Sequence, residues 1–129
     1  MVRSSYLKPC VLTVVLVATT PAAADPASIH DWFASMKRTA KQLRIAVHSG
    51  DAAAFPALRG QAYKAALEIG VWPYGALSQD AARSCGYAAN NLLDAAKAAE
   101  GANVVGFRDS FGRYDSSETS CSSAINAAR

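Results

Sequence analysis

Two cysteines are the residues of this chain best placed for covalent chemistry. Cys85 and Cys121 each lie 18 residues from residue 103, within a turn expected at Gly101–Val104. Two helices folded back on each other at that turn bring the cysteines side by side, so we predict a disulfide that closes a helical hairpin. The sequence contains no C-x-x-C spacing, which would indicate redox chemistry or covalent haem attachment. The pair is therefore interpreted as structural.

The remaining residues capable of chemistry form no catalytic or metal-binding pattern. His30 and His48 are 18 residues apart on the first expected helix, which separates them by about 27 Å and prevents them from sharing one metal ion. Hydrolase, metalloprotease, phosphate-loop and calcium-loop motifs are missing. We therefore predict no enzyme, no metal site and no cofactor. The alternative is a carrier of haem or another small ligand inside the bundle, with Met36 or a histidine as axial ligand.

The first 24 residues resemble a secretory signal in their order of charge, hydropathy and side-chain size. Arg3 and Lys8 precede an apolar run over Cys10–Ala18, and Ala22–Ala24 supply the small residues that signal peptidase recognises. We predict cleavage after Ala24, export to the periplasm or the extracellular space, and a single domain over residues 25–129. An uncleaved membrane anchor is the alternative, but the apolar run is about half the roughly 20 residues that a spanning helix needs.

Charge argues against nucleic acid as a partner. Without Arg3 and Lys8, the 13 Lys and Arg residues fall to 11, against 10 Asp and Glu, so the mature chain has a net charge of +1. A protein that binds nucleic acid normally carries a clear excess of basic residues. Cleavage also removes Cys10 and leaves an even number of cysteines, as expected for one disulfide.

Hydrophobic periodicity predicts four helices and hence an all-α, antiparallel up-down bundle. We expect the first helix to begin after a Ser28 cap and to end at Ser49-Gly50. Its apolar residues recur at steps of three or four: Ile29, Trp32, Phe33, Met36, Ala40, Leu43 and Val47. We expect Asp51 to cap the second helix, which ends at Gly70. Pro56 lies either just inside a helix that starts at Ala52 or at the helix start itself.

The third and fourth helices form the expected disulfide-linked hairpin. The third helix runs from a Ser78 cap to Gly101 and has mostly small inward residues, which allow close packing. They are Ala81 or Ala82, Cys85, Ala88 or Ala89, Leu92, Ala96 and Ala99. The fourth has an apolar stripe of Phe107, Phe111, Tyr114, Cys121 and Ile125. It is either one helix or two, with a restart capped by Asp115 and Glu118.

Four basic residues line one side of the first expected helix. Lys37, Lys41, Arg44 and His48 recur at steps of four, three and four, directly beside the apolar face. The simpler interpretation is a solvated face whose long side chains cover the edge of the core. The alternative is a docking strip for an acidic protein or another anionic component of the cell envelope.

The segment that follows the second helix carries two aromatic residues. Trp72 and Tyr74 flank Pro73 on this connection, where they are candidate anchors for a partner, because Trp and Tyr are frequent in binding hot spots. The alternative is that Trp72 closes the open end of the bundle. We predict an exported, non-catalytic protein that binds another exported or envelope protein in an inhibitor, immunity or chaperone-like role. The candidate surface combines the four basic residues with Trp72 and Tyr74.

Overall fold

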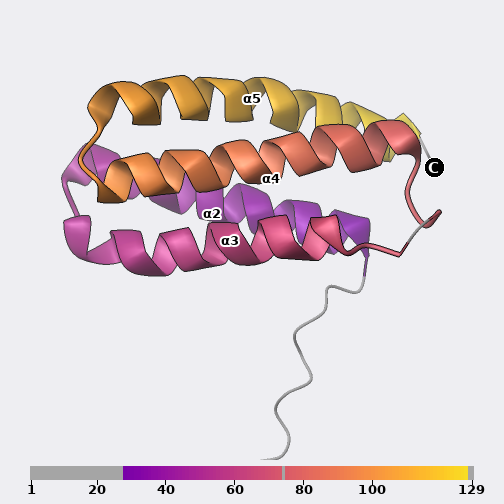
Figure 1. Ribbon diagram of the computed structural model, residues 1–129, viewed down its shortest axis with the longest axis horizontal. Helices are drawn as coiled ribbons and strands as arrows, with labels where there is room; N and C mark the ends of the chain where they lie inside the picture. The colour runs from indigo at the N-terminus through magenta and orange to yellow at the C-terminus, as the bar shows by residue number, and fades with distance from the viewer. Residues whose placement is uncertain (1–27, 74, 128–129) are drawn as a thin grey trace, which may run out of the picture.

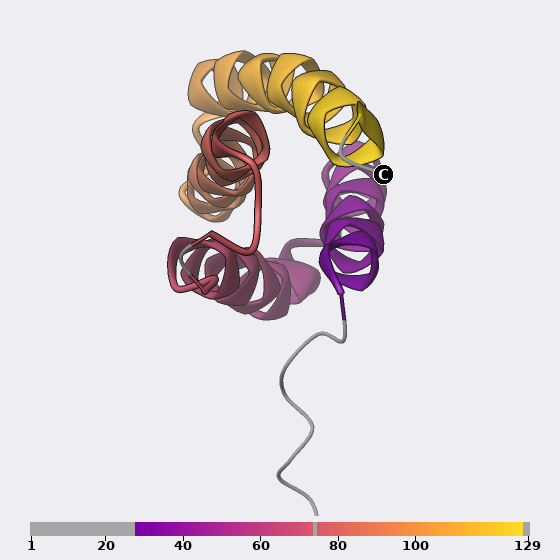
Figure 2. The same ribbon diagram turned by 90° about the vertical axis from the view of Figure 1, so that its right-hand side faces the viewer.

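The computed structural model describes residues 28–73 and 75–127, and every regular element within them is helical. The elements are α2 (Ile29–Ser49), the 3-10 turn η3 (Ala52–Ala54), α3 (Phe55–Gly70), α4 (Gln79–Glu100) and α5 (Val104–Ala127). Consecutive long helices run antiparallel (Figure 1) and surround a common core (Figure 2). The all-helical prediction is confirmed. The predicted signal over residues 1–24 lies outside the described residues.

Side-chain caps set the predicted starts of two helices. The Ser28 hydroxyl oxygen accepts a hydrogen bond from the backbone N–H of Asp31 at 3.1 Å, at the start of α2. The Ser78 hydroxyl accepts one from Ala81 at 3.0 Å, at the start of α4. These bonds satisfy amide groups that have no partner inside the helix. At the other end of α2, Gly50 adopts the left-handed conformation with φ of 71°, as expected for a glycine that ends a helix.

The prediction that Asp51 caps the second helix is wrong. Its side chain makes no capping hydrogen bond, and its backbone carbonyl instead accepts a bond from Ala54 at 3.1 Å within the η3 turn. This turn delays the start of α3 to Phe55, so that Pro56 lies in the first helical turn. Proline is tolerated there because the first amide groups of a helix need no carbonyl partner within it.

The last segment is one continuous helix rather than two. Asn103 directly precedes α5. Its side-chain oxygen accepts a hydrogen bond at 2.9 Å from the N–H of Gly106, which lies in the first turn of the helix. Further along, the Ser117 hydroxyl donates to the carbonyl of Arg113 at 2.9 Å, and similar bonds join other hydroxyls to the preceding turn. Such bonds keep serine and threonine compatible with a helix. The restart at Asp115 therefore does not occur.

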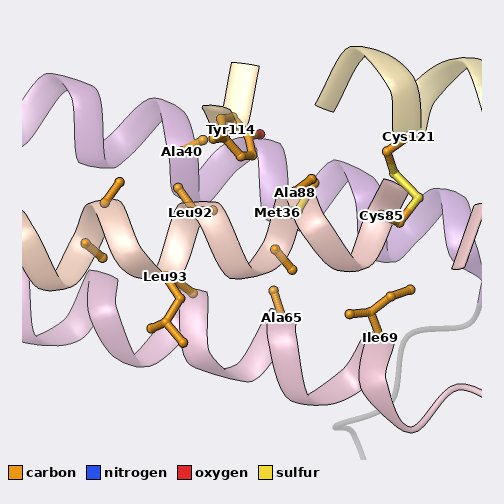
Figure 3. Close-up of a cluster of buried hydrophobic side chains, with 14 of the residues drawn as sticks. Met36, Ala40, Ala65, Ile69, Cys85, Ala88, Leu92, Leu93, Tyr114 and Cys121 are labelled. Carbon is orange, nitrogen blue, oxygen red and sulfur yellow. A yellow bond between two sulfur atoms is a disulfide. The ribbon is translucent and has the colours of Figure 1, made fainter. Parts of the chain in front are cut away.

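The buried residues follow the predicted apolar faces of the helices, and on α4 more residues are buried than predicted. Trp32, Met36 and Leu43 of α2 expose 1% or less of their surface, and the Trp32 indole N–H donates to the carbonyl of Ala65 on α3 at 3.0 Å. On α4, Leu93 and Ala95 are buried in addition to the expected residues. This helix packs against both α3 and α5 (Figure 3), so two faces are covered rather than one.

The interface between α4 and α5 is closed by the predicted cysteine pair. The sulfur atoms of Cys85 and Cys121 lie 2.03 Å apart, at bonding distance, with their Cα atoms at 4.6 Å. Both residues are fully buried. The Asn91 side chain donates a hydrogen bond to the Ser117 hydroxyl at 3.0 Å across the same interface. Small residues, a covalent bond and a polar contact thus hold these two helices together (Figure 3).

Candidate functional site

Positive charge is concentrated on α2. This helix carries four Lys and Arg residues and a single Asp, a net charge of +3, whereas α4 and α5 each carry a net charge of −1. Three of its basic residues, together with the histidine at its end, form the predicted row. Lys37, Lys41, Arg44 and His48 are all exposed. α3 has a net charge of +1, so α2 is the most basic of the four long helices, and the charges of this row are available to solvent.

Arg44 joins this basic helix to α5. Its guanidinium lies 3.1 Å from the carboxylate of Asp115 and 4.5 Å from the centre of the Phe111 ring. More than half of each charged side chain in the pair is exposed, so the pair contributes about 0–1 kcal/mol to stability. Arg44 is therefore partly neutralised by α5. Among the described residues, Lys37, Lys41 and His48 have no such ion pair.

Two hollows lie along the basic row. The first, of about 490 Å³, is lined by Arg44, Ile45, His48 and Ser49 near the end of α2. Ile45 exposes 56% of its surface there, an exposure similar to that of Leu67 on α3 and Val105 on α5. The second, of about 220 Å³, lies between α2 and α5, and we call it the Tyr114 pocket. Its lining residues are Lys37, Ala40, Lys41, Arg44, Tyr114, Asp115 and Glu118.

Tyr114 lines the Tyr114 pocket and carries a buried polar atom that has no hydrogen-bond partner. The residue is 2% exposed, and its hydroxyl exposes less than 1 Å² and makes no hydrogen bond to the described residues. Burial raises the pKa of the phenol well above its ordinary value, and the nearby carboxylates of Glu118 and Asp115 raise it further. The hydroxyl is therefore neutral and able to donate. A buried hydroxyl without a partner costs about 1–3 kcal/mol.

The sequence pattern did not identify Tyr114 as a candidate functional residue. Its spacing from Phe111 and Cys121 correctly placed it in the core stripe of α5. Figure 3 shows its side chain reaching across to Ala40 of α2. Whether a buried phenol finds an acceptor depends on side chains from another helix, so helical periodicity carries no signal for it.

Trp72 lies at the opposite end of α3 from His48, the last residue of the basic row. Trp72 is partly buried and packs against the core, which agrees with the interpretation that it closes the end of the bundle. It follows the end of α3, whereas His48 lies near the end of α2, close to the start of α3. The length of α3, 16 residues, separates the two by about 24 Å. Tyr74 lies outside the described residues.

Met36 lies in the hydrophobic core, which agrees with a packing role for its side chain. This residue is fully buried within the hydrophobic cluster, and His30 and His48 are exposed near opposite ends of α2. In residues 28–73 and 75–127, no three or more His, Cys, Asp or Glu residues gather as a metal site would require. The carrier hypothesis stays a prediction, and an absorption spectrum of the protein from its native host tests it.

None of the helices that the structure describes is both long and apolar enough to cross a membrane. Comparisons with protein-family models, with curated proteins and with solved structures each find no match to this chain. The function is therefore argued from the residues and their arrangement.

Proposed function

We propose that this protein is exported, is non-catalytic and binds an acidic protein of the cell envelope on one side of α2. We call this surface the α2 face and define it by Lys37, Lys41, Arg44, Ile45 and His48. The observation that carries the proposal is an exposed row of cations beside an exposed isoleucine, on a helix with a net charge of +3. The role is that of an inhibitor, an immunity protein or a chaperone-like protein.

Charge and apolar surface have separate roles in such binding. Opposite charges accelerate encounter and fix the orientation of a partner. Desolvated apolar side chains supply much of the affinity. Ile45 lies between Arg44 and His48 at a hollow of about 490 Å³, so one partner segment can contact all three. A fully solvated face does not require an apolar residue at this position.

Export is supported by the same cysteines that close the α4–α5 interface. Disulfides form and persist in oxidising compartments and are rare in the cytosol. The sulfur atoms of Cys85 and Cys121 are at bonding distance, and the predicted signal supplies a route to such a compartment. The proposed partner is therefore a protein that meets this chain after export.

Charge reversal on the α2 face is the direct test of this function. We expect an immobilised wild-type protein to retain a specific acidic protein from envelope extract, and the double variant Lys41→Glu and Arg44→Glu to lose it. The matched control is Lys64→Glu with Arg83→Glu, which changes the net charge equally on exposed positions of α3 and α4. Equal loss in both double variants contradicts a specific α2 face.

A variant at Trp72 is expected to behave differently from the charge-reversal variant of the α2 face. Because Trp72 packs against the core at the far end of α3, Trp72→Ala is expected to lower the free energy of unfolding and to leave partner capture unchanged. Loss of capture by a Trp72→Ala variant that is still folded indicates that the partner also contacts this end of the bundle.

A further inference from the structure

We propose that the Tyr114 pocket receives an acidic side chain of the partner, whose carboxylate accepts a hydrogen bond from the Tyr114 hydroxyl. The proposal rests on the proposed function and specifies which chemical group of the partner enters the α2 face. Its basis is the coincidence of a pocket, a buried hydroxyl without a partner and two lysines at one place.

The Tyr114 hydroxyl is a donor that this chain leaves unused. It is neutral, it exposes less than 1 Å², and it makes no hydrogen bond to the described residues, although the carboxylates of Asp115 and Glu118 line the same pocket. Hydrogen bonds to charged acceptors are stronger than bonds between neutral groups. A carboxylate is therefore the acceptor that gains most from this hydroxyl. A neutral acceptor would gain less and would leave the lysines uncompensated.

The charges at the pocket favour a single carboxylate. Lys37 and Lys41 line one side from α2, while Arg44 is already paired with Asp115. Glu118 lines the opposite side from α5 and repels an incoming anion. A carboxylate next to the two lysines and the tyrosine is nevertheless attracted, because two unpaired cations face one unpaired anion.

The size of the pocket and the flexibility of its rim limit what can enter. A volume of about 220 Å³ admits a side chain but no folded element. Lys37 and Lys41 are exposed, and their flexible aliphatic chains can move aside to admit a carboxylate to the buried hydroxyl. Aspartate and glutamate side chains have the required charge and reach.

A chemically simple probe tests this contact without the natural partner. The probe is a peptide of eight glutamates, titrated into the full-length mature protein at low ionic strength, with affinity measured by calorimetry. We expect Tyr114→Phe to weaken binding about tenfold, the loss expected for one hydrogen bond to a charged group. The control is Tyr63→Phe, which removes a hydroxyl from an exposed tyrosine of α3 and should leave affinity unchanged.

Two further readouts accompany the affinity measurement, and the second distinguishes direct contact with Tyr114 from general electrostatic attraction. Glu118→Gln should strengthen binding, because it removes the repelling charge at the pocket. The Cζ resonance of Tyr114 should shift on titration, as expected when its hydroxyl gains an acceptor. Unchanged affinity of Tyr114→Phe, with its fold intact, overturns the inference.

The outcomes separate the inference from the proposed function. If Tyr114→Phe binds like the wild type while Lys41→Glu with Arg44→Glu abolishes binding, the α2 face stands and the Tyr114 contact is wrong. If the wild type does not bind the glutamate peptide at all, both the acidic partner and the inserted carboxylate are contradicted.

Discussion

The two interfaces that α5 makes differ in kind. Against α4 it packs extensively, through small residues, the Cys85–Cys121 pair and the bond between Asn91 and Ser117. Against α2 it makes few contacts, held at Arg44 by an exposed ion pair and a stacked Phe111 ring. Both interfaces border a hollow, of about 640 Å³ along α4 and α5 and about 220 Å³ between α2 and α5. The α2–α5 interface differs in containing a buried hydroxyl that makes no hydrogen bond to the described residues.

This difference suggests a division between stability and binding. A covalent bond and close packing hold α5 in place from one side, so its other side does not need complementary contacts for the fold. Unpaired polar groups are normally removed from a core or satisfied within it. Their retention between α2 and α5 is therefore explained if another molecule satisfies them.

The largest expected effect comes from removing the disulfide. Replacing both Cys85 and Cys121 by alanine opens a covalently closed loop spanning a sequence separation of 36 residues. We expect the free energy of unfolding to fall by about 3–4 kcal/mol, because the unfolded chain regains conformational freedom. Urea unfolding followed by circular dichroism measures this change. An unchanged midpoint would show that the cysteine pair contributes nothing to stability.

Overpacking the same interface should be the next largest effect. Ala95 is fully buried and lies one helical turn from Asn91, on the side of α4 that faces α5. Ala95→Leu is expected to destabilise the protein by about 1–3 kcal/mol, since the added atoms have no space. The control, Ala82→Leu on an exposed position of α4, should change stability by less than about 0.5 kcal/mol. Similar costs for the two variants contradict close packing here.

Breaking the contact between α2 and α5 should cost less. Arg44→Ala removes an exposed ion pair and a cation–π contact between the exposed guanidinium and the buried Phe111 ring, so we expect a loss of about 0.5–1 kcal/mol. A double-mutant cycle with Asp115→Ala isolates the ion pair. A coupling energy above about 2 kcal/mol would show that the α2–α5 interface is as important for stability as the α4–α5 interface.

The last variant is expected to have an effect of the opposite sign. Tyr114→Phe removes a buried hydroxyl that has no partner and is expected to stabilise the free protein by about 1 kcal/mol. Chemical unfolding in the absence of any ligand measures it. Destabilisation by a similar amount means that the hydroxyl has an acceptor in the free protein, which removes the basis for the Tyr114 contact.

Much of the fold follows from local pattern. The caps at Ser28 and Ser78 and the spacing of apolar residues on α2 are local signals, and the structure contains them as predicted. The pairing of Cys85 with Cys121 could be predicted because both cysteines lie equally far in sequence from the turn that joins the two helices. The cap predicted at Asp51 was wrong because Ala52–Ala54 form a 3-10 turn, so Asp51 precedes this turn and not the helix itself.

Only part of the candidate site could be predicted from the sequence. The row from Lys37 to His48 depends on spacing within one helix and could be identified. The unpartnered hydroxyl of Tyr114 and the packing of Trp72 against the core depend on how different helices meet. Such relations are set by tertiary packing, about which periodicity within a single helix says nothing.

The most direct test of the α2 face and the Tyr114 pocket as a binding site is to map where an acidic ligand binds. Amide resonances of the isotope-labelled, oxidised protein are followed during titration with the peptide of eight glutamates. We predict shifts confined to residues 37–48 of α2 and residues 111–118 of α5, on both sides of the Tyr114 pocket. Shifts centred on the exposed Tyr63 and Leu67 of α3, or no shifts at all, would contradict it.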